Sequence, residues 1–210
     1  MQTKKLAMLL MAGSALAAPT ARSDSAVDPA LQNITYTVMA IRSGSPVQYL
    51  PLNAIAGRFY LGGNTTSFCP DSDSCGNTCP PGNVTVFDGS CALDASNPEY
   101  YDVSEQTLWT TDNGVIGYDF SQVRPENAYN CPWYLGTSEN AVFAATIETT
   151  YGADGFLACP TATDGIWQVL RDVTDESELA PPQGDASKCL SIDLVALEYN
   201  ATEYGAYVYS

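Results

Sequence analysis

The chain has 210 residues, enough for one ordinary domain with its own core, and its 8 Lys and Arg against 24 Asp and Glu give a formal net charge of −16. A surface this acidic repels phosphate backbones and anionic lipids, so nucleic-acid binding and membrane-surface binding fall to the bottom of the candidate functions. The chain contains no histidine, which excludes Ser-His-Asp and Cys-His nucleophile systems and every zinc pattern that needs an imidazole.

The N-terminal stretch MQTKKLAMLLMAGSALAAPT predicts a secretory signal peptide over residues 1–17. Lys4 and Lys5 form its basic start, residues 6–12 are apolar, and small residues precede a cleavage point after Ala17. The apolar run is too short to cross a bilayer, which takes about 20 residues. We therefore expect a soluble, exported protein, whose 8 − 2 = 6 basic and 24 acidic residues give a net charge of −18 after cleavage.

Residues 18–33 are predicted to be irregular, and from residue 34 the pattern becomes that of a β protein. ITYTVMAIRS alternates two sets of side chains and is rich in β-branched residues, as expected of a strand with two distinct faces. Similar short runs follow at VQYLPL, RFYLGG, NVTVF, QTLWTT, VIGYDF, AVFAATIETT, GFLACP, GIWQVL, SIDLVALEY and AYVYS. Dipeptides that favour tight turns separate several of them: Asp88-Gly89, Asn113-Gly114, Asp154-Gly155 and Asp164-Gly165.

No convincing amphipathic helix interrupts these runs. Many short strands with regular turns predict one all-β domain over residues 34–210, an antiparallel β-sandwich with a β-barrel as the alternative. The acidic, proline-containing stretch RDVTDESELAPPQGDASK predicts a mobile acidic loop near residues 172–188.

Seven cysteines are spread over the domain: Cys69, Cys75, Cys79, Cys91, Cys131, Cys159 and Cys189. In an oxidising compartment such residues form structural disulfides, and their spacing lacks the C-x2-C pairs of zinc sites and redox centres. We pair Cys69 with Cys79 and Cys159 with Cys189. Cys75, Cys91 and Cys131 then share one bridge. The odd count leaves one thiol unpaired or bonded to another chain, so a disulfide-linked dimer stays open.

Four Asn-x-Ser/Thr sequons, none with proline in the middle, predict N-glycosylation at surface positions: Asn33, Asn64, Asn83 and Asn200.

Paired carboxylates are acid–base machinery that this composition still allows, as in an acid glycoside hydrolase. The candidates are scattered without a distinguishing local motif: Asp88, Glu99, Asp102, Glu105, Asp119 and Glu148. We therefore predict no catalytic residues, no metal site and no cofactor. Aromatic side chains offer a carbohydrate-binding alternative, because their faces can stack on sugar rings, although aromatics in β proteins more often pack in the core. The stacking candidates are Tyr100, Tyr101, Trp109, Trp133 and Tyr134.

Four strings carry a family resemblance: AIRSGSPVQYLPLNA, RFYLGGNTTSFCP, TCPPGNVTVF and GFLACPTATDGIWQV. Together they resemble the PhiA-type secreted proteins of filamentous fungi, a group that includes cell wall proteins linked to spore-bearing cells and IgE-binding allergens. The resemblance covers residues 36–87 and 155–170, while residues 92–150 depart from the family pattern. It implies an extracellular or wall-associated fungal protein connected with asexual development, and it supplies no catalytic residues.

The leading hypothesis is a non-catalytic, disulfide-stapled, N-glycosylated β domain that acts as a cell wall or surface component. Its expected partners are wall components or polysaccharide. The alternatives are a lectin-like module that binds wall polysaccharide and, less favoured, a carboxylate-dependent acid glycoside hydrolase.

Overall fold

The structure is a computed structural model that describes residues 34–69, 82–94, 106–119, 124–136, 144–150, 155–175, 177–199, 205–206 and 208–210. The predicted signal peptide and the irregular segment 18–33 lie outside these ranges. Within them the chain forms β-strands and one 3-10 turn, η2 (Ala186–Lys188). No helix in the described ranges has the length and apolar character needed to cross a membrane.

The strands are short and follow one another closely along the chain. Their bounds are β1 (Thr35–Ile41), β2 (Leu52–Ile55), β3 (Arg58–Leu61), β4 (Ser67–Phe68), β5 (Phe87–Asp88), β6 (Ala92–Leu93), β7 (Gln106–Thr110), β8 (Ile116–Asp119), β9 (Tyr129–Asn130), β10 (Trp133–Gly136), β11 (Ala144–Thr149), β12 (Gly155–Pro160), β13 (Trp167–Asp172), β14 (Leu190–Glu198) and β15 (Val208–Tyr209).

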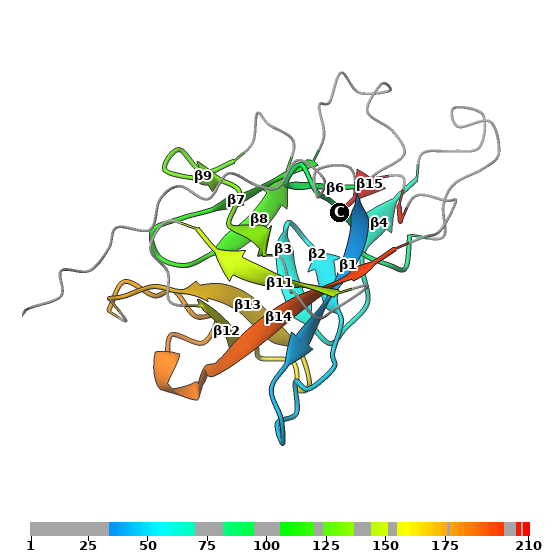
Figure 1. The fold of residues 1–210 in the computed structure, drawn as a ribbon. Coiled ribbons are helices and arrows are strands. Elements are labelled where there is room, and N and C mark those ends of the chain that lie inside the picture. The colour runs from blue at the N-terminus through cyan, green and yellow to red at the C-terminus, as the bar shows by residue number, and fades with distance from the viewer. Residues whose placement is uncertain are drawn as a thin grey trace, which may run out of the picture.

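One antiparallel sheet contains most of these strands, in the order β1-β5-β6-β7-β8-β3-β13-β12-β14-β11-β10, with β2 added to β3 and β9 added to β7. A separate sheet pairs β15 with β4. β1 also pairs with β14, from Tyr36↔Glu198 to Ile41↔Asp193. Figure 1 shows this ladder crossing in front of β2 and β3, so the large sheet folds over and its inner faces enclose a common core.

The predicted alternation along the first strand is confirmed. Tyr36, Val38 and Ala40 of β1 are buried, while the residues between them are partly exposed. β14 repeats the pattern opposite β1, because its inward side chains fall at alternate positions on the same face: Ile192, Leu194 and Ala196. Apolar side chains from both strands therefore meet in the core.

Aromatic rings fill the centre of the core. Phe59 of β3, Phe87 of β5 and Trp133 of β10 contact one another, with ring centroids 5.5 to 5.8 Å apart. Tyr36 stacks on Phe87 with centroids 5.5 Å apart, and Phe156 approaches Trp133 edge-on at 6.1 Å. Such ring pairs add to the stabilisation from buried area. The rings join strands that are far apart in the sequence.

Turn chemistry explains several connections. Asn113-Gly114 and Asp164-Gly165 lie between consecutive strands, as predicted, and Asp88-Gly89 begins the β5–β6 turn with Asp88 as the last residue of β5. Gly114 has φ +80°, and a Cβ at that position would come within 2.6 Å of the Arg171 carbonyl oxygen. The β2–β3 hairpin was not anticipated, because its turn uses Ala56 at φ +48° before Gly57 at φ +75°, and alanine rarely adopts that conformation.

The all-β, antiparallel fold class is confirmed, and the folded-over sheet is consistent with the predicted sandwich. The stretch after β13 contacts the body of the domain, because the Ala180 N–H donates to the Asn113 carbonyl at 3.2 Å. Its mobility and the predicted domain bounds stay predictions.

Candidate functional site

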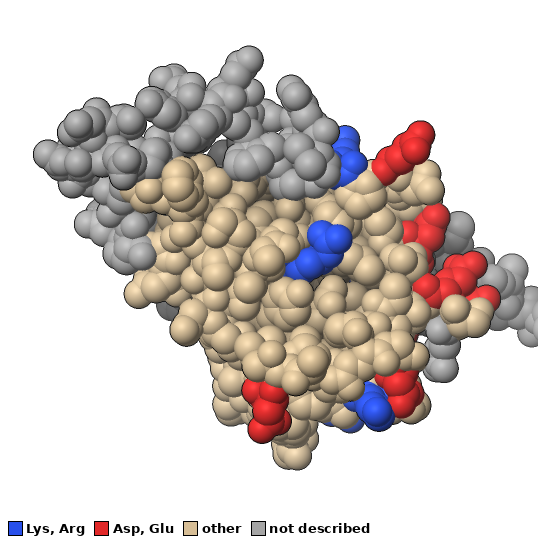
Figure 2. All heavy atoms as spheres, turned by 180° about the vertical axis from the view of Figure 1, so that it is seen from behind, with Lys and Arg blue, Asp and Glu red and all other residues tan. Residues whose placement is uncertain are grey.

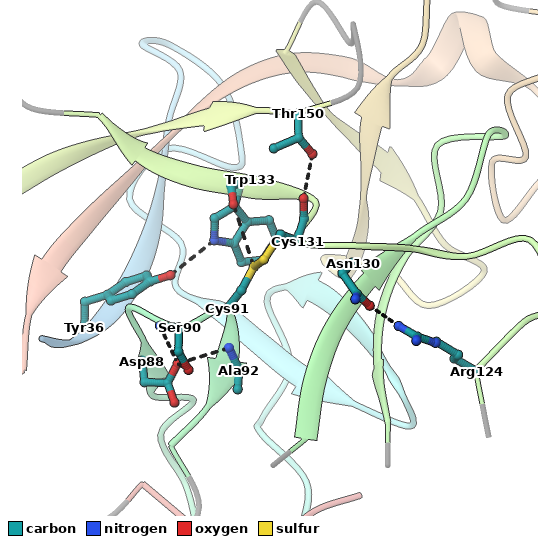
Figure 3. The surroundings of a disulfide bond; sticks show 10 residues. All are labelled: Tyr36, Asp88, Ser90, Cys91, Ala92, Arg124, Asn130, Cys131, Trp133 and Thr150. Atoms are coloured by element: carbon teal, nitrogen blue, oxygen red, sulfur yellow. Dashed lines mark hydrogen bonds between the residues drawn. A yellow bond between two sulfur atoms is a disulfide. The ribbon is translucent and has the colours of Figure 1, made fainter. Parts of the chain in front are cut away.

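Trp133 is a core residue, so its predicted role in sugar stacking is wrong. Its side chain is 2% exposed, and its Nε1–H donates to the Tyr36 hydroxyl at 3.2 Å (Figure 3). Burial raises the pKa of that tyrosine. A ring enclosed on all sides offers no face to a sugar.

Trp109 is also unavailable to a ligand, which corrects the second tryptophan prediction. Its ring lies over Gly117, the cross-strand neighbour on β8, where a Cβ would come within 2.4 Å of Trp109 Cζ2. The Arg58 guanidinium covers the indole at 4.6 Å from its centroid, within the range of a cation–π interaction. The indole is only 1% exposed. Tyr134 on β10 is half-buried, and Tyr100 and Tyr101 lie outside the described residues.

The exposed aromatic side chains of the described part of the chain are ones that the sequence did not single out. Tyr49 is 65% exposed, Phe68 is 50% exposed and Tyr129 is 40% exposed. Tyr49 stands in VQYLPL, where the pattern predicted a regular strand. Its positive φ of 65° is incompatible with a regular strand at this residue. No turn-forming residue at this position signals the change, so alternation alone could not find it.

Two disulfides join described residues. Cys159 of β12 bonds to Cys189 next to η2, which is the pair predicted above, and Cys91 bonds to Cys131. Cys69 is disulfide-bonded. Its predicted partner Cys79, and Cys75, lie outside the described residues, and a disulfide-linked dimer stays a prediction.

The Cys91–Cys131 bridge joins two short strands that meet end to end along one edge of β7. β6 pairs with β7 up to Thr107, and β9 pairs with it from Trp109. Leu108 lies at the junction, where its N–H donates to the Cys91 carbonyl at 2.9 Å and its own carbonyl accepts from the Cys131 N–H at 3.2 Å. Both cysteines have positive φ, 75° and 56°. The bridge fixes the point where each strand leaves the ladder (Figure 3).

Of the six carboxylates considered for catalysis, Asp88 is the one whose side chain the structure describes. Its Oδ1 accepts from the Ser90 N–H at 2.8 Å, the Ser90 hydroxyl at 2.6 Å and the Ala92 N–H at 3.1 Å, which closes the β5–β6 turn. These hydrogen bonds give Asp88 a structural role in the turn. The side chains of Glu99, Asp102, Glu105, Asp119 and Glu148 lie outside the described residues.

Asp94, at the end of β6, was not among the candidates. Burial and, to a smaller extent, the charge of Asp88 raise the pKa of its carboxyl above the ordinary value. Sequence reasoning could not find Asp94, because its burial depends on tertiary packing that the local sequence does not encode.

Replacing Asp94 by alanine should make stability less sensitive to rising pH. Because its pKa is higher in the folded chain, Asp94 contributes most favourably below the ordinary carboxyl pKa of about 4, and that contribution is lost as pH rises through the raised value. The variant should therefore gain free energy of unfolding relative to the native chain as pH rises above the ordinary carboxyl pKa of about 4, measured by urea titration. Asparagine is avoided because it would complete a sequon with Ser96.

The control for this measurement is Asp185, an exposed residue whose pKa is lowered chiefly by the Ser187 hydroxyl. A lowered pKa reverses the sign, so Asp185→Ala should lose stability relative to the native chain as pH rises. Parallel profiles for the two variants would contradict at least one of the two assignments, because the predicted slopes have opposite signs.

Two of the four sequons lie in described residues, and both asparagines are exposed: Asn64 precedes β4, and Asn83 precedes β5. Asn33 and Asn200 lie outside the described residues. Glycosylation at any of the four sequons stays a prediction. Asn64 and Asn83 meet the first structural requirement for it, because both are exposed.

Buried hydroxyls connect the two exposed sequons. The Thr65 hydroxyl donates to Asn53 Oδ1 at 3.1 Å and lies 2.8 Å from the Thr85 hydroxyl, while the Ala54 N–H donates to Thr85 Oγ1 at 2.7 Å. Since the proton of Thr65 goes to Asn53, Thr85 is the donor between the two threonines. Thr85 is 2% exposed and Thr65 is 8% exposed. The network therefore ties residues 64–66 and 83–85 to β2.

The described residues include no group of three or more His, Cys, Asp or Glu side chains placed to hold a metal ion. Figure 2 shows the rear face with Asp and Glu near its edges and mostly uncharged residues between them, with basic side chain atoms near the centre. On this face the acidity is dispersed, which suits solubility better than binding of one cation.

Comparison with known proteins assigns the family. A family model described as PhiA-like secreted protein matches residues 36–210. The cell wall protein phiA of Aspergillus niger is 30% identical over 163 residues, covering 74% of this chain and 78% of the relative. The corresponding protein of Aspergillus fumigatus is 28% identical over 180 residues, covering 84% and 86%.

An uncharacterized secreted protein of Arthroderma benhamiae is 28% identical over 166 residues, covering 78% of this chain and 80% of the relative. No solved structure matches the chain. The family model spans the region from β1 to the last described residue, including the central part where the sequence resemblance was poorest. The chain belongs to the PhiA-like secreted protein family.

Proposed function

We propose that this protein is a non-catalytic, N-glycosylated component of a fungal cell wall, connected with asexual development. The observation that carries the proposal is the family match over residues 36–210, together with relatives named cell wall protein. The developmental link comes from the resemblance alone. Wall material is the expected partner, and the oxidised cysteines suit an extracellular location.

The structure of the domain supports a function as a stable wall component. Trp109 and Trp133 are packed in the interior, and Asp88 forms the hydrogen bonds of a turn. Each bridge between described cysteines closes a long loop, with sequence separations of 40 and 30 residues. A cross-linked β domain with surface glycans would resist unfolding and proteolysis in the wall.

The proposal is tested by expression in a filamentous fungal host, followed by separation of wall, medium and cell lysate. We expect the protein in the wall fraction, carrying mass that peptide N-glycosidase removes. Asn64→Gln and Asn83→Gln should each remove one glycan. Protein confined to the cell lysate, or a mass unchanged by the glycosidase, would contradict the location or the modification respectively.

Asparagine is the residue to change, because the sequon threonine at 85 has a structural function. Thr85→Ala would also remove the acceptor of the buried Ala54 N–H, which should lower the free energy of unfolding by about 2 kcal/mol. Asn83→Gln leaves that bond intact. Comparing the two variants as unglycosylated protein separates the effect of the glycan from the effect of the hydroxyl.

A further inference from the structure

Tyr49 combines two costs that packing does not explain. It occupies the end of the loop between β1 and β2, with φ +65° and a side chain that is 65% exposed. A left-handed backbone costs a residue with a Cβ roughly 1 to 2 kcal/mol, and an aromatic ring in water gains nothing from burial. Strained residues of this kind occur disproportionately at ligand sites, so the outlier motivates a functional hypothesis.

The loop holds Tyr49 on a fixed support. The side chain of Val47 is fully buried in the core. The Tyr49 N–H donates to the Ala40 carbonyl at 2.9 Å, and the Ala40 N–H donates to the Leu50 carbonyl at 3.0 Å. Figure 1 shows this loop, in blue, projecting from the lower end of the molecule. The ring is therefore presented outward by an anchored backbone, which lowers the entropy lost on binding.

Polar groups lie at the base of the same loop. Gln48 Oε1 accepts from the Arg42 N–H at 2.5 Å, so the two ends of the loop are held together. The Arg42 guanidinium donates to the Ser191 carbonyl of β14 and has further N–H donors at its other nitrogens. Ser43 is exposed beside it. An apolar face and several hydrogen-bonding groups thus share one end of the domain.

We infer that Tyr49 is the stacking platform of a binding site for neutral polysaccharide, with Arg42 and Gln48 as hydrogen-bonding groups. A sugar ring offers an apolar face to the phenol and hydroxyls to the polar groups. Neutral chains fit best, because a net charge of −16 repels polyanions. A single stacked ring gives weak affinity, on the order of millimolar, and many copies on one polymer would raise retention through avidity.

This inference rests on the proposed location in the wall, and its test uses the exported, disulfide-intact protein. The protein is mixed with insoluble β-glucan, chitin or mannan, and the bound fraction is measured by depletion. We expect the native chain to be retained on at least one polymer and Tyr49→Asn to be retained about tenfold less. Asparagine tolerates positive φ, so the variant should unfold at the same or a higher urea concentration.

A purely structural role would give the opposite result, with stability lost and retention unchanged. Phe68→Ser is the matched control, because Phe68 is another exposed ring and should leave retention unaltered. Native protein that binds none of the polymers, or Tyr49→Asn that binds as the native chain does, would overturn the site. Either outcome with protein still in the wall fraction would leave the proposed function standing.

Discussion

Trp133→Ala should lower the free energy of unfolding by about 4 kcal/mol, because it removes the indole from the centre of the aromatic core. The ring contacts Phe59, Phe87 and Phe156, so a cavity would open where four strands meet. The substitution also leaves the buried Tyr36 hydroxyl without the Nε1–H that now donates to it. Urea titration with the disulfides intact measures the loss.

The control for this prediction is Phe68→Ser, which removes an aromatic side chain that is half exposed and should cost about 1 kcal/mol or less. Trp133→Phe should fall between the two, since it keeps part of the ring volume and loses the hydrogen bond. A change below about 1 kcal/mol for Trp133→Ala would show that the core is not organised around this ring. Polysaccharide retention by any Trp133 variant that remains folded should equal that of the native chain.

The fate of the aromatic residues shows what the sequence could predict and what it could not. The alternation in ITYTVMAIRS predicted β1 and its buried face, because a period of two depends only on neighbouring residues. Cys-Pro-Trp-Tyr contains no such information about Trp133. Its burial results from β10 pairing with β11, which follows a segment of several intervening residues. Tyr49 shows the opposite case, an exposed aromatic residue that the sequence did not single out. Its exposure depends on a backbone conformation that is unusual for tyrosine.

One of the two described disulfides was predicted from the sequence as a pair, and the other was not. Cys159 lies in β12 and Cys189 immediately precedes the neighbouring strand β14, so the predicted pair is the one that forms. Cys91 and Cys131 meet only because β6 and β9 share an edge of β7. The prediction left one bridge to be shared among Cys75, Cys91 and Cys131. Which two of them pair depends on the order of the strands in the sheet, which the sequence does not show.

Removing the Cys91–Cys131 bridge should lower the free energy of unfolding by about 4 kcal/mol in the chain-entropy model, and removing Cys159–Cys189 should cost nearly the same. The sequence separations are 40 and 30 residues, and loop-closure entropy changes slowly with length. Cys91→Ala/Cys131→Ala and Cys159→Ala/Cys189→Ala are therefore matched variants. Urea titration compares their global stability.

Hydrogen exchange should distinguish the two variants where global stability does not. β6 and β9 have two residues each, and the left-handed residues at their junction favour departure from β7 once the bridge is gone. The Leu108 amide, which donates to the Cys91 carbonyl, should lose protection in Cys91→Ala/Cys131→Ala and keep it in the other variant. Amides of the β1–β14 ladder should stay protected in both. Equal exchange at Leu108 in the two variants would mean that the strands hold β7 without the bridge, and that the bridge acts only on the unfolded chain.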